Sequence, residues 1–222
     1  MRSFEEIFDR AAARKGGAAA VEAQLPTLKT PAELAALPDD RWLSMMSRCV
    51  FQAGFSWSVV DKKWPGTEEA FWSFSPARCR AMSDEEFDAL LKDARIIRNG
   101  AKIRSVQNNA AFVMDLAAEH GSAARAFADW PMRDYVGLLD LLKTRGDRLG
   151  GGAGMMMLRF MGKDSWVTSP DMVKALALEG VIDGAPDTKK ARRATQAAFD
   201  AWAEESGRPF AHISRVLAMS VD

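Results

Sequence analysis

The chain has 222 residues, of which 48% are hydrophobic, and its 30 lysines and arginines equal its 30 aspartates and glutamates. This length and apolar content suffice to bury a sizeable core, which excludes an intrinsically disordered protein and a small disulfide-stapled scaffold. Because the formal net charge is zero, a histone-like polycation is excluded too, and any nucleic-acid site must be a local basic face.

The cysteines and the N-terminal sequence indicate the compartment. Cys49 and Cys79 lie 30 positions apart with no His or Cys at ligand spacing, so we expect free thiols and neither a disulfide framework nor a metal site. The first residues include acids where a signal peptide needs an apolar run, and no stretch approaches the roughly 20 apolar residues of a membrane span. We therefore expect a cytoplasmic protein with no membrane segment.

The spacing of apolar residues predicts an all-α fold. Helical periodicity recurs along almost the whole chain, and the alternation typical of strands is nowhere convincing. Residues 1–40 are rich in alanine but are interrupted by Gly16, Gly17 and three prolines. We expect them to form an extended N-terminal arm packed on a helical domain of residues 41–222.

Two helices are expected between residues 83 and 121. Ser83 is placed to cap the first, and Glu86, three residues on, completes a capping box. Asn99-Gly100 supplies a turn, after which apolar residues from Ile103 to Ala117 share one face of a longer helix that ends at Gly121.

A glycine-rich segment separates the next two helices. The first follows Pro131 and has an inner face from Tyr135 to Leu142, and the second contains the apolar run at 155–158. Between them, residues 145–154 contain five glycines and form a tight connection. Downstream, Ser169-Pro170-Asp171 starts a helix that runs toward Gly180; another spans about 188–205, and a last one follows Pro209.

The glycine-rich segment is a candidate phosphate site. Glycines that join two helices expose successive amides beside a helix N-terminus, where the helix dipole favours an anion, and basic side chains flank the segment. The residues that we expect at a DNA backbone are Lys143, Arg145, Arg148, Gly150 and Gly152. The alternative is a plain connector between helices.

Large aromatic residues gather shortly after residue 56. They are Trp57, Trp64, Phe71, Trp72 and Phe74. Core packing explains most of them, and base stacking by at least one is the alternative. Gly54 supports stacking because it permits close backbone approach, and a stacked base contributes roughly 1–3 kcal/mol.

The chain resembles the DNA-3-methyladenine glycosylase I family from about Cys49 to Ala111. The resemblance rests on Q-A-G-F-S-W at 52–57, K-K-W after it, Ala70-Phe71, D-A-R-I-I-R-N-G-A-K-I at 93–103, and Asn109-Ala110. A weaker likeness extends it to about residue 175 and covers the place where that family keeps its helix-hairpin-helix. The resemblance implies a helix-hairpin-helix DNA glycosylase fold with the hairpin at 145–154.

The resemblance also implies a function in DNA repair. Such an enzyme flips an alkylated purine, such as 3-methyladenine, out of duplex DNA and hydrolyses its N-glycosidic bond. By position, Trp57 stacks on the flipped base and Phe55 fills the gap as a wedge, while Lys102 either braces the fold or contacts a phosphate. The implied partner is double-stranded DNA with alkylated bases, bound by a monomer without a cofactor. No lysine is placed for Schiff-base chemistry, so no lyase step is expected.

The sequence departs from the family at two sites. The base-recognising glutamate falls at Cys49 in the base pocket, where a thiol is only a weak hydrogen-bond donor. The family also joins its termini with zinc, but the first forty residues lack Cys and His, and the later ligands fall at Met172 and Leu176. No zinc is therefore expected, and specificity for 3-methyladenine stays open.

The wider superfamily carries a catalytic aspartate after the hairpin. Asp171 is the candidate, because the dipole at a helix start keeps a carboxylate ionised, and Asp164 is the second choice. An ordinary first-turn acid is the alternative for Asp171. We expect no site role for His120 or His212.

Two other functions stay open. One is a catalytically inactive helix-hairpin-helix module that binds DNA or senses damage, which the cysteine at position 49 and the missing zinc ligands favour. The other is a helical protein-interaction domain, in which the glycine-rich segment is only a connector.

Overall fold

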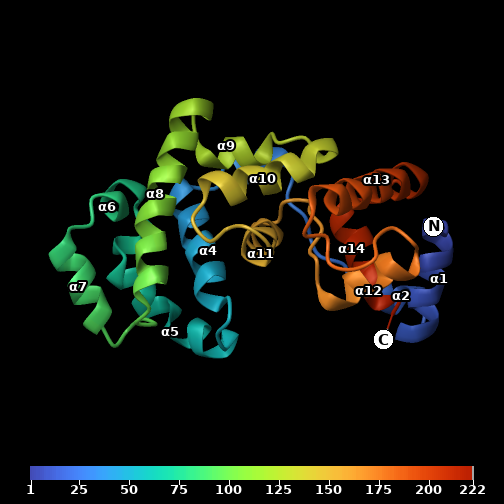
Figure 1. Cartoon of the computed structure of the whole chain (residues 1–222), viewed down its shortest axis with the longest axis horizontal. Helices are drawn as coiled ribbons and strands as arrows, with labels where there is room; N and C mark the ends of the chain where they lie inside the picture. The colour runs from blue at the N-terminus through green and yellow to red at the C-terminus, as the bar shows by residue number, and fades with distance from the viewer. Residues whose placement is uncertain (222) are drawn as a thin grey trace. The chain divides into compact units, whose positions relative to one another are not determined.

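The computed structural model describes residues 1–221, which contain helices and turns and no strand (Figure 1). This confirms the all-α fold. The chain divides into two compact units. The central unit comprises Lys29–Trp130 and Leu138–Met161, and the terminal unit comprises Met1–Leu28, Pro131–Gly137 and the chain from Gly162 onward. Within residues 1–221, no helix combines the length and the apolarity needed to cross a bilayer.

The central unit is built around a long helix, α8 (Gly100–His120). The side chain of Asn99 accepts a hydrogen bond from the amide of Lys102 at its start, and Gly121 ends it with φ of 85°. The predicted end of this helix is thus confirmed, whereas Asn99-Gly100 forms the cap and first residue of the helix in place of the predicted turn. The other helices of the unit are α3 (Pro31–Ala35), α4 (Asp39–Gln52), α5 (Trp57–Ala70), α6 (Pro76–Arg80), α7 (Asp84–Lys92), α9 (Ala123–Ala128) and α11 (Gly152–Met161).

Most of the clustered aromatic residues fill the core of the central unit. The ring of Trp64 stacks on Phe74 at 5.5 Å, and Phe74 stacks on Phe71 at 5.5 Å. Arg78 lies over the ring of Trp72, 3.7 Å from its centroid. Core packing is therefore confirmed for Trp64, Phe71 and Phe74, whereas Trp72 is partly buried and Trp57 is exposed.

The terminal unit packs around Trp166. Its helices are α1 (Phe4–Lys15), α2 (Ala18–Glu22), α12 (Pro170–Leu178), α13 (Lys189–Ser206) and α14 (Phe210–Met219). The indole of Trp166 contacts the rings of Tyr135, Phe199 and Phe210 at 4.5, 4.9 and 5.7 Å. The helix α10 (Tyr135–Arg145) belongs to the terminal unit up to Gly137 and to the central unit beyond it.

The expectation of an extended arm over residues 1–40 is wrong. This segment contains α1, α2 and α3, with short breaks at the positions of the glycines and prolines. Capping boxes explain why such short helices form: Ser3 pairs with Glu6 at the start of α1, and Thr30 pairs with Glu33 at the start of α3. The independence of residues 41–222 as one domain stays a prediction.

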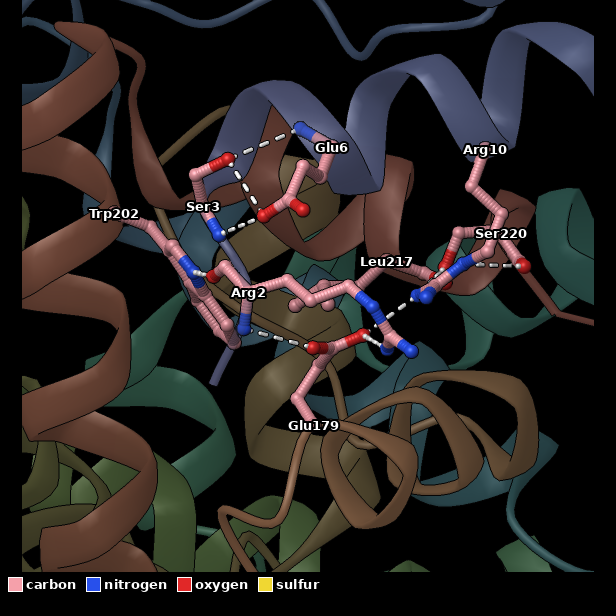
Figure 2. Close-up of polar contacts among 8 residues, drawn as sticks. All are labelled: Arg2, Ser3, Glu6, Arg10, Glu179, Trp202, Leu217 and Ser220. Atoms are coloured by element: carbon pink, nitrogen blue, oxygen red, sulfur yellow. Dashed lines mark hydrogen bonds and ion pairs between the residues drawn. The ribbon is translucent and has the colours of Figure 1, made fainter.

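The two ends of the chain meet at Glu179, at the end of α12 (Figure 2). The buried carboxylate of Glu179 accepts hydrogen bonds from the amide and guanidinium of Arg2, each at 3.1 Å, and from the guanidinium of Arg10 at 2.8 Å. Arg10 also donates to the backbone oxygen and the hydroxyl of Ser220, at 3.1 and 3.0 Å. Burial by itself raises the pKa of Glu179, but the hydrogen bonds from Arg10 and Arg2 outweigh it and lower that pKa below its usual value.

Candidate functional site

A cavity of about 420 Å³ lies in the central unit where α4 ends. Its wall is formed by the last turn of α4, the turn that follows, and residues near the starts of α5 and α11. Helix α11 packs against α4 (Figure 1). The lining residues are Cys49, Gln52, Ala53, Gly54, Phe55, Ser56, Trp57, Gly152, Ala153 and Met156. The cavity thus joins the Q-A-G-F-S-W segment to the end of the glycine-rich segment.

Exposed aromatic side chains surround this cavity. Gly54 takes φ of 68°, which reverses the chain so that Phe55 and Trp57 follow the end of α4 directly. Trp57 is 48% exposed and Phe55 46%. Phe160, which is 42% exposed, meets the indole of Trp57 edge-on, with ring centroids 6.1 Å apart. Large apolar side chains left in water at one place are typical of an interaction site.

Lys102 braces the turn between α4 and α5. Its side chain is 7% exposed, and its ammonium donates to the backbone oxygens of Phe51 and Ala53 at 2.9 and 2.7 Å. Burial, with a smaller contribution from Arg148, lowers the pKa of Lys102. These bonds support bracing, the alternative given for Lys102, and its contact with a phosphate stays a prediction.

The loop at residues 146–151, called here the glycine-rich loop, is held by α8. The side chain of Asn109 is buried, accepts a hydrogen bond from the amide of Asp147 at 2.8 Å and donates to the carbonyl of Asp147 at 3.0 Å. Asn108, one residue earlier, donates to the carboxylate of Asp147 at 2.7 Å. The sequence singled out Asn109 only as part of a resemblance, because a pairing across 38 positions leaves no local signal.

The backbone of the glycine-rich loop requires several glycines. Gly151 takes φ of 80°, and a Cβ on Gly154 would lie 2.2 Å from the carbonyl oxygen of Leu149. The amides from Leu149 to Gly152 have no hydrogen-bond acceptor among residues 1–221. These amides lie next to the start of α11, so the loop offers donors to an anion at a helix N-terminus.

The basic residues near the loop differ in their availability. Lys143 and Arg148 are exposed, as are Gly150 and Gly152. Arg145 is exposed too, but its guanidinium forms a two-point ion pair with Glu119 at 2.8 and 2.6 Å. The hydrogen bond from Arg145 lowers the pKa of Glu119. Arg145 must therefore exchange this partner before it contacts a phosphate.

Part of the chain is similar to known proteins. Residues 36–134 match the methyladenine glycosylase family. Over 59 residues the chain is 41% identical to "DNA-3-methyladenine glycosylase 1" of Escherichia coli (strain K12) and 37% identical to "DNA-3-methyladenine glycosylase" of Haemophilus influenzae (strain ATCC 51907 / DSM 11121 / KW20 / Rd). Each match covers 27% of this chain and 32% of the relative, so the chain matches about a third of the length of these relatives. The resemblance to this family is confirmed.

Two solved structures establish that the fold is that of 3-methyladenine DNA glycosylase I. A crystal structure of that enzyme has a TM-score of 0.51 at 24% identity, over 65% of this chain and 86% of the other. The enzyme from Staphylococcus aureus has a TM-score of 0.50 at 19% identity, over 60% and 81%. The family match includes the cavity residues from Cys49 to Trp57, with Lys102 and Asn109, and ends before the glycine-rich loop.

Cys49 stands where the methyladenine glycosylase family is expected to carry its glutamate. The thiol lies in the cavity wall and is buried. Burial raises the pKa of Cys49 to about 12, so the thiol stays neutral in ordinary buffers. This position therefore offers no negative charge to a bound base.

The zinc site implied by the family does not fit this chain. Met172 and Leu176, at the positions of the later ligands, are fully buried in the core of the terminal unit. Among residues 1–221, no three His, Cys, Asp or Glu side chains come together as a group that could hold a metal ion. Arg10 joins the two ends of the chain instead, because it contacts both Glu179 and Ser220.

The candidate acids lie in the terminal unit. Asp171 is exposed in the first turn of α12, whose start is capped by Ser169 through the amide of Met172 at 3.2 Å. Asp164 accepts hydrogen bonds from the amides of Phe210 and Ala211 at 3.2 and 2.7 Å, so it caps α14. Asp164 thus has a structural role, and a catalytic role for it stays a prediction.

The histidines take part in ordinary contacts. His212 shares a hydrogen bond of 3.0 Å with the carbonyl of Pro26, and His120 lies 3.7 Å from the carboxylate of Glu119. Neither residue lines the cavity.

Proposed function

We propose that this protein is a DNA glycosylase that flips an alkylated purine, such as 3-methyladenine, out of duplex DNA and hydrolyses its N-glycosidic bond. The observation that carries the proposal is the half-exposed indole of Trp57 at a cavity of about 420 Å³. Small-ligand pockets measure roughly 300–1,000 Å³, and a base that enters this one can stack on the indole. The relatives named for this activity match the chain over 59 residues at 41% and 37% identity.

The DNA contacts follow from the surroundings of the cavity. Phe55 is the proposed wedge, because its exposed ring follows a turn that Lys102 holds in place. An apolar wedge that fills the space left by the flipped base offsets part of the lost stacking. We propose that the DNA backbone is contacted by the free amides of the glycine-rich loop, including that of Gly150, and by the amide of Gly152 at the start of α11. The proposed side-chain contacts are Lys143, Arg145 and Arg148.

The chemistry requires little acid catalysis. An N3- or N7-alkylated purine is cationic and leaves readily as a neutral base, while water adds to C1′ of the sugar and loses a proton to solvent. We propose that the carboxylate of Asp171 stabilises the positive charge that develops on the sugar or orients the water. Its exposed place at a helix start supports this role. No lyase step is proposed.

We also propose that double-stranded DNA with alkylated bases is the partner, that the protein acts as a monomer, and that it is cytoplasmic. The two free, buried thiols at Cys49 and Cys79 support a reducing compartment. Analytical sedimentation with and without duplex DNA tests whether the protein is a monomer.

The decisive experiment is a chromatographic profile of the bases released from randomly methylated duplex DNA. We expect 3-methyladenine or a related alkylpurine among the products, at a rate that depends on Trp57. If no base is released at high protein excess while duplex binding persists, the second candidate holds. That candidate is a catalytically inactive DNA-binding or damage-sensing module, and the neutral thiol of Cys49 is the observation that favours it.

A further inference from the structure

The last residue of α4, Gln52, is a buried polar group in the wall of the cavity. Its side chain is 3% exposed. Buried amides are normally satisfied at both ends, because an unpaired polar group costs roughly 1–3 kcal/mol. In Gln52 only the nitrogen end of the amide has a hydrogen-bond partner.

The orientation of this amide is fixed by Asp61 of α5. Nε2 of Gln52 donates to Oδ1 of Asp61 at 2.9 Å. The same oxygen accepts from Nε and Nη2 of Arg48 at 3.1 and 2.9 Å. An ionised carboxylate only accepts hydrogen bonds, so the nitrogen of the amide must face Asp61 and the oxygen must face away from it.

The carbonyl oxygen of Gln52 is left without a donor. Oε1 is buried and accepts no hydrogen bond from residues 1–221. The polar neighbours are already committed, since the ammonium of Lys102 donates to two carbonyls and the hydroxyl of Ser56 pairs with that of Ser58. The side chain of Gln52 in the cavity wall therefore lacks a hydrogen-bond donor, which a ligand could supply.

We propose that Gln52 reads the extruded base, and that its Oε1 accepts a hydrogen bond from the exocyclic 6-amino group of a purine. Asp61 is a positioning residue, because it turns the acceptor end of the amide away from itself. Asp61 uses one N–H of this amide, and the oxygen is the atom of the side chain that the structure leaves unpaired. This inference rests on the proposed function and names the base edge that the cavity selects.

A neutral acceptor selects differently from a carboxylate. It favours an amino donor whether or not the base is cationic, and it disfavours a 6-oxo purine, which presents a second acceptor. The pocket is thus expected to discriminate by the donor on the base rather than by its charge.

The test measures the affinity of two free bases by NMR titration of the full chain. The probes are 3-methyladenine and 3-methylpurine, which is the same ring without the 6-amino group. We expect the unaltered protein to prefer 3-methyladenine by roughly 5- to 10-fold, the usual effect of one neutral hydrogen bond. The preference disappears in Gln52→Met, which keeps the volume and removes both polar atoms.

A second variant leaves Gln52 in place. Asp61→Ala removes the anchor at a partly exposed position, so the amide can turn either way, and the preference for 3-methyladenine should fall by half or more. Asp88→Ala, at an exposed position on α7, is the matched control and should keep the full preference.

The outcomes separate the two proposals. If 3-methyladenine binds and Trp57→Ala abolishes binding, but Gln52→Met and Asp61→Ala keep the preference, the reading by Gln52 is overturned and the proposed function stands. If neither base binds the unaltered protein, or if Trp57→Ala binds both as well as the unaltered protein does, the base pocket itself is overturned and the inference falls with it.

Discussion

The indole of Trp57 and the ring of Phe160 meet edge to face, with their planes inclined at 75° and both rings largely in water. Trp57 begins α5, and Phe160 lies near the end of α11. An edge-to-face pair of this kind contributes about 0.5–1.5 kcal/mol. The contact restricts the orientation of the indole, about half of whose surface stays exposed.

Trp57→Ala should reduce the rate of base release by roughly 5- to 150-fold, the equivalent of the 1–3 kcal/mol that stacking contributes. Phe160→Ala should have a smaller effect in the same direction, because it removes only the orienting contact. Release from methylated DNA measures both. Val59→Ala, another exposed apolar position on α5, is the control. Equal rates for all three variants would remove Trp57 from the site.

Asn109→Ala should loosen the glycine-rich loop, because it removes two hydrogen bonds to the backbone of Asp147. We expect a loss of about 1–3 kcal/mol in the free energy of unfolding, and weaker duplex binding at temperatures where the variant is still folded. Urea denaturation and fluorescence anisotropy measure the two effects. Asn108→Ala loses only an exposed side-chain contact and should be milder. If duplex binding is unchanged in a destabilised Asn109→Ala, the loop does not hold DNA.

Lys102→Met should leave the salt dependence of duplex binding unchanged while it lowers base release by about 10-fold or more, because the turn with Phe55 loses its brace. Lys143→Met and Arg148→Met should each reduce the slope of log K against log salt by about 0.9, the value for one lost phosphate contact. A reduced slope for Lys102→Met would identify Lys102 as a phosphate contact.

Glu179→Gln should destabilise the terminal unit by about 1–3 kcal/mol at neutral pH, since Arg2 and Arg10 lose their anionic partner. The pKa of Glu179 is lowered by folding, so its stabilising contribution is present above the usual carboxyl pKa and is lost as pH falls through the lowered value. The difference between the two proteins should therefore shrink in acid. Thermal unfolding at several pH values measures it, with the exposed Glu204→Gln as control.

Asp171→Asn should slow base release without changing stability, because asparagine is tolerated at a helix start. Single-turnover release under enzyme excess measures the chemical step. Asp84→Asn makes the same change in the first turn of α7 and should have no effect on rate. If Asp171→Asn releases base at the original rate, the catalytic role is lost and the ordinary first-turn acid remains.

Features with local causes could be predicted from the sequence. The capping box of Ser83 and Glu86 and the helix end at Gly121 lie where the pattern placed them. The aromatic cluster was correctly attributed mostly to the core. The helices of residues 1–40 are harder to predict, because glycines and prolines interrupt the pattern, although Ser3 with Glu6 is a readable capping box.

Features that join distant residues could not be predicted. Asn109 finds Asp147 across 38 positions, and Arg2 finds Glu179 across 177, and neither pairing changes the local pattern of hydrophobic residues. The exposure of Phe160 beside Trp57 likewise depends on how α11 packs against α4. The amide orientation of Gln52 follows only from its contact with Asp61.

The attachment of the first residues at Glu179 determines which solution conditions unfold the terminal unit. Ends held by guanidinium and carboxylate groups contain no thiolate that an oxidant could attack and no ligand set that a chelator could strip. Purification in EDTA or under air therefore leaves this attachment intact. Guanidinium chloride competes directly for the carboxylate, so it should unfold this unit more readily, relative to urea, than the surface exposed on unfolding alone predicts.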